Sequence, residues 1–166
     1  MNAPVESGSA RVPAALVADL DEALRAEFGA RAIDLLLARS SSDAELARLF
    51  ATLAEEQDAQ LARLQALIND LGGRARSHCR RRSVLARLLH ATRFLGGRKL
   101  TLRLCHDAAE SLEYRYLGCG RYFAATGALG LAQRCSELAT TKARHARALS
   151  TWVEHGEHPA GPPRRR

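Results

Sequence analysis

The stretch SDAELARLFATLAEEQDAQLARLQALINDLGG, residues 42–73, decides the fold of this chain. Its apolar residues recur at alternating spacings of four and three, the pattern of a helix that buries one face in a bundle. Two amides, Gln57 and Gln60, interrupt that face near its middle. The whole face reads Leu46, Phe50, Leu53, Gln57, Gln60, Leu64, Leu67 and Leu71. The stretch therefore predicts a long amphipathic helix with a polar gap in its buried side.

Both ends of this helix carry boundary signals. Residues 42–45 have the capping-box form, in which the hydroxyl of Ser42 and the carboxylate of Glu45 satisfy backbone amides of the first turn. At the other end, Gly72 and Gly73 supply a residue that adopts a left-handed conformation at little cost. The helix is thus expected to end at about Leu71.

Three further segments repeat the same spacing, and no segment alternates as a strand does. Helices are predicted at residues 14–39, with Pro13 at the opening, at 100–125 and at 129–154. Their apolar faces read Leu16, Leu20, Ala23, Glu27, Ala30, Asp34, Leu37 in the first; Leu102, His106, Ala109, Glu113, Tyr116, Gly120, Phe123 in the third; and Leu131, Cys135, Leu138, Lys142, His145, Leu149, Trp152 in the fourth. The predicted fold class is all-α, a four-helix bundle.

The connection between the second and third helices is long. Residues 83–95 can form a short helix bounded by Gly96 and Gly97. A crossover of this length can return the chain to the opposite end of the bundle, as in bundles whose second and third helices run parallel. We therefore expect a long crossover rather than a short turn.

Length and composition allow one domain. The chain has 166 residues, of which 46% are hydrophobic and 5% aromatic; this suits a single globular core. We expect a bundle at residues 13–155, a flexible N-terminus at 1–12 and a flexible basic tail at 156–166. The start, MNAPVESGSARV, has no basic segment followed by an apolar run, so a cytoplasmic, bacterial-type protein is expected. The cysteines lack Cys-x-x-Cys spacing, which argues against a zinc knuckle.

Counting residues outward from the predicted turns places polar side chains of all four helices at one level, the middle of the bundle. Each helix contributes at least one such side chain, and those side chains are Glu27; Gln57 and Gln60; Glu110 or Glu113; and Lys142 with His145.

These residues resemble the ferritin-like four-helix bundles, in which two helices each give a Glu and the other two each give Glu-x-x-His to a pair of irons. The resemblance covers residues 16–152. It rests on the polar positions Glu27, Glu110, Glu113 and His145, on the stretch 53–60 (LAEEQDAQ) and on the Gly-Gly pair after it. The chain looks like a branch of these bundles described as a domain of unknown function, which carries no agreed activity.

The departures from the family pattern concern the metal. Gln57-x-x-Gln60 and Lys142-x-x-His145 stand where the family has Glu-x-x-His, so three of the six ligand positions are lost. An amide is a poor substitute for a bridging carboxylate, and an ammonium group has no lone pair to donate. We therefore predict a degenerate di-iron site without a cofactor, in which Gln57, Gln60 and Lys142 form a polar core network.

Two other interpretations stay open. In the first, Glu27, Glu110, Glu113 and His145 form a residual site that binds iron or manganese, and the protein is an oxidase or a metal store. In the second, arginines bind nucleic acid or an acidic partner, because residues 72–104 contain ten basic residues and no acidic one within a chain of net charge +7. The basic patch comprises Arg80, Arg81, Arg82, Arg87 and Arg98.

Several residues have a simpler expected role. Cys119 and Cys135 fall on either side of the predicted turn at Gly127 and are expected to pack in the core, with a redox pair as the alternative. Asp34 and His106 lie on either side of the polar level along the bundle, and both are expected to be partly solvated. Overall the sequence predicts a non-catalytic accessory or stress-related protein that forms a homodimer or larger oligomer and does not act at a membrane.

Overall fold

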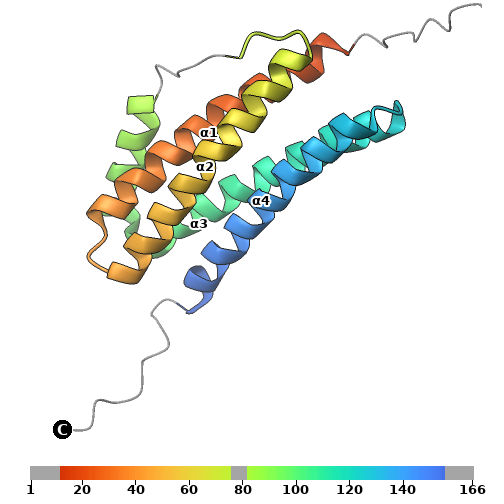
Figure 1. The fold of residues 1–166 in the computed structure, drawn as a ribbon. Helices are drawn as coiled ribbons and strands as arrows, with labels where there is room; N and C mark the ends of the chain where they lie inside the picture. Colours follow the sequence, from red (N-terminus) through yellow and green to blue (C-terminus); the bar gives the residue numbers. More distant parts are fainter. Residues whose placement is uncertain (1–11, 76–81, 156–166) are drawn as a thin grey trace, which may run out of the picture.

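The computed structural model describes residues 12–75 and 82–155, of which residues 82–96 and 155 are described by their backbone alone. This part of the chain is a four-helix bundle without a strand, which confirms the predicted all-α class (Figure 1). The helices are α1 (Ala14–Ser40), α2 (Ala44–Asp70), α3 (Arg82–Ala125) and α4 (Leu129–His155). The expected flexible ends, 1–12 and 156–166, lie almost entirely outside the described residues.

The helices form a square in which diagonal partners run in the same direction. Among the described residues, α1 packs against α2 and α3, and α4 packs against the same two helices. The start of α1, the end of α2, the end of α3 and the start of α4 share one core cluster. Each neighbouring pair in the square is therefore antiparallel, whereas α2 runs parallel to the part of α3 that follows Gly97 (Figure 1).

Glycine sets the breaks between the helical segments. Gly97 has a φ of 71° and a ψ of 177° and interrupts α3, so the predicted break at the second glycine of the pair is present. Gly72 and Gly127, which follow α2 and α3, both have a φ of 78°. A side chain with a Cβ is disfavoured in this left-handed region, which explains why glycine ends these segments.

The N-terminal cap of α2 differs from the prediction. Asp43, not Ser42, is the N-cap, and its Oδ1 accepts hydrogen bonds from the backbone N–H groups of Glu45 at 3.0 Å and Leu46 at 3.1 Å. A carboxylate is favoured at this position because it also interacts with the positive end of the helix dipole. The boundary was thus predicted correctly, and the capping residue was wrong by one.

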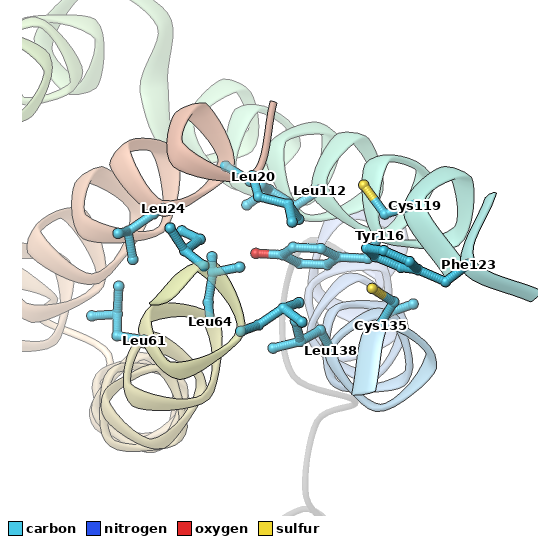
Figure 2. Close-up of a cluster of buried hydrophobic side chains, with 14 of the residues drawn as sticks. Leu20, Leu24, Leu61, Leu64, Leu112, Tyr116, Cys119, Phe123, Cys135 and Leu138 are labelled. Atoms are coloured by element: carbon cyan, nitrogen blue, oxygen red, sulfur yellow. The ribbon is translucent and has the colours of Figure 1, made fainter. Parts of the chain in front are cut away.

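The core has two apolar clusters, one toward each end of the bundle. The cluster in Figure 2 holds Leu20, Leu24, Leu61, Leu64, Leu112, Tyr116, Cys119, Phe123, Cys135 and Leu138, among others. The second holds Ile33, Leu37, Leu46, Phe50, Leu53, Leu102 and Leu149. Cys119 and Cys135 are buried, as expected of core thiols, and burial raises the pKa of Cys119 to about 11 and that of Cys135 to about 12.

The buried face of α3 is rotated relative to the prediction. Leu112 and Cys119 lie in the core, whereas Glu113 and Gly120 are only half-buried. The predicted face and the observed face share Leu102, Ala109, Tyr116 and Phe123. They differ in which residue is buried between these shared positions. Leu112 is favoured over Glu113 because an unpaired buried carboxylate is costly.

None of the described helices combines the length and the apolar character that crossing a membrane requires.

Candidate functional site

A buried carboxylate, Glu27 of α1, lies at the centre of the polar level. Its side chain is fully buried, and it is bound from each of the other three helices. The hydroxyl of Tyr116 on α3 donates a hydrogen bond of 2.8 Å to Oε1. Gln60 Nε2 on α2 donates to the same oxygen at 3.3 Å, and Lys142 Nζ on α4 forms an ion pair of 2.6 Å with Oε2. Glu27 is therefore the residue at which all four helices meet.

The ammonium group of Lys142 neutralises the buried carboxylate of Glu27. Lys142 is 1% exposed and Glu27 is 0% exposed, so water screens neither group. Removing two charges from water is expensive, and it is tolerated only when they pair closely and form further hydrogen bonds. The contacts from Tyr116 and Gln60 supply those further bonds. The pair and its two neutral neighbours thus form an electrically neutral unit, in which Gln60 Oε1 has no hydrogen-bond partner among the described residues.

Tyr116 and Gln60 bind Glu27 as neutral donors. Burial, followed by the negative charge of Glu27, raises the pKa of Tyr116 well above its ordinary value, so its hydroxyl stays protonated. Gln60 Nε2 also donates to the backbone carbonyl oxygen of Leu138 at 3.1 Å, which ties α2 to α4. Both side chains therefore stabilise the carboxylate without adding charge.

His145 lies one turn after Lys142 and binds a different carboxylate. Its Nε2 lies 2.8 Å from Oε2 of Glu56, which also accepts a hydrogen bond of 2.8 Å from Arg144. Burial, followed by the charge of Lys142, lowers the pKa of His145. Burial acts to raise the pKa of Glu56, but the hydrogen bonds and charges of His145 and Arg144 together lower it. A neutral imidazole that donates from Nε2 to the ionised Glu56 is consistent with the lowered pKa of both groups. It leaves Nδ1 as an acceptor.

The structure brings together only part of the predicted metal set. Glu27 and His145 are buried, and so are the predicted network residues Gln57, Gln60 and Lys142. Glu110 is exposed, and Glu113 is half-buried without joining the contacts around Glu27. The interpretation that placed these two carboxylates on the inner face of the third helix is wrong, because α3 turns Leu112 and Cys119 inward instead.

Glu110 instead belongs to a group on the outer surface of α3. His106 Nδ1 lies 3.2 Å from Asp107 Oδ1 and 3.7 Å from Glu110 Oε2. The ligand atoms of the three residues lie within 4.8 Å of one another. Side-chain exposures of 70% for Asp107 and 60% for Glu110 mark this as an open surface group rather than an enclosed site. His106 is partly solvated, as expected.

Sequence reasoning missed three residues of the polar level. Tyr116 was placed on the inner face but not assigned to the network, and Glu56 was not singled out beside its neighbour Gln57. Asp34 was expected to be partly solvated, but it is 5% exposed, so that prediction is wrong. A signal existed for Asp34, because it lies seven residues after Glu27 and therefore on nearly the same face of one helix.

Asp34 differs from Glu27 in having no close partner. No described residue donates a hydrogen bond to it or forms an ion pair with it. Burial raises the pKa of Asp34 to about 7, and the more distant charges of Lys142 and Glu27 act in opposite directions. Asp34 lines a cavity of about 430 Å³ together with Gln57, Lys142 and His145.

The residues present do not fit the pair of irons that the family resemblance implies. Lys142 places its ammonium group directly on Glu27, where a metal would need the carboxylate oxygens. Two amides take the place of the anionic and imidazole ligands on α2. Because cations repel one another and an ammonium group offers no lone pair, this donor set does not suit a di-iron centre.

Most of the predicted basic patch lies outside the described side chains: Arg80 and Arg81 fall between the two described ranges, and Arg82 and Arg87 are described by backbone alone. Arg98 is described and is already engaged. It forms an ion pair of 3.1 Å with Asp43, and its guanidinium lies 5.1 Å from the ring centre of Trp152. Binding to nucleic acid or to an acidic partner, and the oligomeric state, stay predictions.

Comparison with known proteins adds no relative, since no family model, curated protein or solved structure matches the chain. The resemblance to ferritin-like bundles thus rests on the residues described above.

Proposed function

We propose that this chain is a ferritin-like bundle in which an internal ion pair has replaced the metal centre, and that it acts as a non-catalytic accessory or stress-related protein of the cytoplasm. The observation that carries the proposal is the buried contact of 2.6 Å between Lys142 Nζ and Glu27 Oε2. The ammonium group supplies the positive charge that a metal ion would otherwise bring to Glu27.

The helix arrangement supports the same proposal. The parallel relation of α2 to the later part of α3 is what a long crossover connection produces in a ferritin-like bundle (Figure 1). Glu27 also contacts Gln60 and Lys142, two residues at the positions that the resemblance assigns to ligands, and these contacts support the proposal. A metal-dependent oxidase or store would instead need carboxylates from α3, and the two candidates there are not part of this group.

The experiment is a metal-loading series. The purified chain and the variants Lys142→Glu and His145→Ala are incubated anaerobically with Fe(II), desalted and analysed for iron, manganese and zinc. Arg147→Glu is the matched control, because it makes the same charge change on α4 at an exposed position. Circular dichroism establishes that each variant is folded.

The proposal predicts little metal in the unchanged chain and in Arg147→Glu, and metal gained by Lys142→Glu, which would then present carboxylates from two helices. A further change, Glu27→Gln in the Lys142→Glu background, should abolish that gain. Near-stoichiometric metal in the unchanged chain that is lost in His145→Ala would overturn the proposal and support the oxidase or metal store. The unchanged chain decides the matter even if Lys142→Glu does not fold.

A further inference from the structure

The cavity beside the polar level has the composition of a small-molecule site. Its volume is about 430 Å³, and residues of all four helices line it. Apolar side chains make most of the wall, and they include Ala26, Ala30, Ile33, Leu53, Ala109 and Leu112. A largely apolar pocket with a few polar groups is the usual form of a ligand site in a protein.

Among the ionisable groups around the cavity, one buried carboxyl group has no ion-pair partner. Lys142 lines the cavity, but its ammonium group is paired with Glu27, so the two charges cancel. Arg115 and Glu22 also line it, and they form an ion pair of 3.7 Å with each other. His145 is neutral near pH 7, because its pKa is lowered. Asp34 is the remaining ionisable group of the polar wall that is more than nine-tenths buried, and it has no hydrogen-bond or ion-pair partner among the described residues. Its carboxylate form has nothing close by to neutralise it.

Two more residues supply acceptor atoms at the cavity. Gln57 is 2% exposed, and its Oε1 has no hydrogen-bond partner in the described part of the chain. His145 engages Glu56 through Nε2, which leaves Nδ1 as an acceptor. Buried polar groups nearly always find partners, so a set without them indicates a missing donor.

We propose that this cavity binds a small primary amine in its ammonium form, with the charged head at Asp34 and an apolar body against the aliphatic wall. An ammonium group has three N–H donors and no acceptor. At Asp34 it would neutralise the one unpaired carboxylate, and its other N–H groups would face a wall that also holds Gln57 and His145.

Other ligand chemistries fit this wall less well. A carboxylate ligand would add a second unpaired negative charge beside Asp34, because Lys142 is already ion-paired with Glu27. A neutral alcohol would occupy the apolar space but would leave the charge of Asp34 uncompensated. The cavity also limits size: a cavity of about 150 Å³ accommodates benzene, so about 430 Å³ admits a ligand of up to roughly 17 non-hydrogen atoms.

Three probes of nearly equal size separate these chemistries: 2-phenylethylamine, 2-phenylethanol and phenylacetate. Each is titrated by calorimetry and by NMR into the full chain, treated with a chelator so that no metal contributes. A buffer above pH 7 ionises Asp34, whose pKa is raised to about 7, while the amine remains protonated. We expect the amine to bind roughly tenfold or more tightly than the alcohol, because charge-assisted hydrogen bonds are stronger than neutral ones. Phenylacetate should not bind measurably.

Variants locate the binding. Asp34→Asn keeps the shape and removes the charge, and it should weaken binding of the amine by roughly tenfold or more while leaving that of the alcohol unchanged. Asp107→Asn makes the same chemical change on the exposed surface of α3 and should have no effect. Ala30→Leu fills the cavity and should weaken both ligands.

The opposite results overturn the proposal. Equal binding of amine and alcohol would show an apolar cavity without a charged subsite, and preferential binding of phenylacetate would assign recognition to a cation of the wall, Lys142 or Arg115. Absence of binding by all three probes, or amine binding that survives Asp34→Asn in a folded variant, would also reject it. Circular dichroism and the alcohol titration establish that Asp34→Asn keeps the cavity intact.

Discussion

The hydroxyl of Tyr116 donates a hydrogen bond of 2.8 Å to Oε1 of Glu27, and this contact joins α3 to α1 across the middle of the bundle. In Figure 2 the ring of Tyr116 reaches from α3 into the apolar cluster, with its hydroxyl oxygen directed toward Leu24 and Leu64. One residue therefore belongs both to the apolar core and to the polar level.

Removal of this hydroxyl should destabilise the fold. Tyr116→Phe keeps the ring and deletes one donor to a buried carboxylate, which we expect to lower the free energy of unfolding by about 1.5–3 kcal/mol. Urea denaturation followed by circular dichroism measures the change. Tyr114→Phe is the matched control, because Tyr114 is 73% exposed on the same helix, and its effect should stay within about 0.5 kcal/mol. Equal effects of the two substitutions would contradict the assigned hydrogen bond.

The buried ion pair should behave as a unit. Lys142→Met leaves Glu27 buried without its cation and should cost about 3–5 kcal/mol of stability. Glu27→Gln alone leaves the ammonium group unpaired and should have a similar cost. The double variant removes both charges and should be far more stable than the sum of the single effects predicts. Denaturation of all four proteins tests this coupling.

A surface pair provides the comparison for this cycle. Arg134 and Asp70 lie 2.6 Å apart, but their side chains are 34% and 59% exposed. Their coupling should be about 0.2–1 kcal/mol, because water screens exposed pairs. If the Glu27–Lys142 coupling is as small as that of the surface pair, the buried pair does not have the structural role assigned to it.

The fold and the candidate site could be predicted from the sequence to different extents. The period of the apolar residues gave the four helices, and the glycines gave their breaks, because both signals act over a few residues. The face of α3 was assigned one position off, although Leu112 and Cys119 are more apolar than Glu113 and Gly120. Residue by residue, hydrophobicity favoured the observed face, whereas the alternating spacing of four and three, continued from Leu102, placed Glu113 and Gly120 on it.

The cavity could not be predicted in this way. Its existence depends on how far α1 and α3 separate, which is set by the sum of side chains from four helices. Asp34 lies on the inner face in the sequence pattern, but the pattern does not show whether a partner reaches it. Burial of an unpaired carboxyl group is a property of the three-dimensional packing, and the raised pKa follows from that burial.

Asp34 should make stability fall as pH rises. Its pKa is about 7 in the folded chain against 3.8 as the ordinary value, so the folded state binds the proton more tightly than the unfolded state. Stability from this group is fully present below about pH 4 and is lost progressively up to about pH 7, by as much as about 4 kcal/mol. Asp34→Asn cannot titrate, so it should remove this component.

The measurement compares the free energy of unfolding of the unchanged chain and Asp34→Asn at several pH values across this window. Their difference should grow in favour of the variant as pH rises, and Asp107→Asn should follow the unchanged chain. A difference that does not vary with pH would show that Asp34 has an ordinary pKa in the folded protein.

Gly73 should be required by close packing rather than by its backbone conformation. A Cβ at this position would lie 2.7 Å from both Ile68 Cγ2 and Val17 Cγ1, which is closer than van der Waals contact allows. Gly73→Ala should therefore lower the free energy of unfolding by about 1–3 kcal/mol, because α1 and the end of α2 must shift apart.

Gly118→Ala is the control: it lies within α3 with nothing within 4 Å of the added atom. Alanine favours a helix there, so this variant should gain about 0.5–1 kcal/mol in the same denaturation experiment. The prediction fails if both substitutions change stability in the same direction, because the close approach of Val17 to Gly73 would then not limit the packing of these helices.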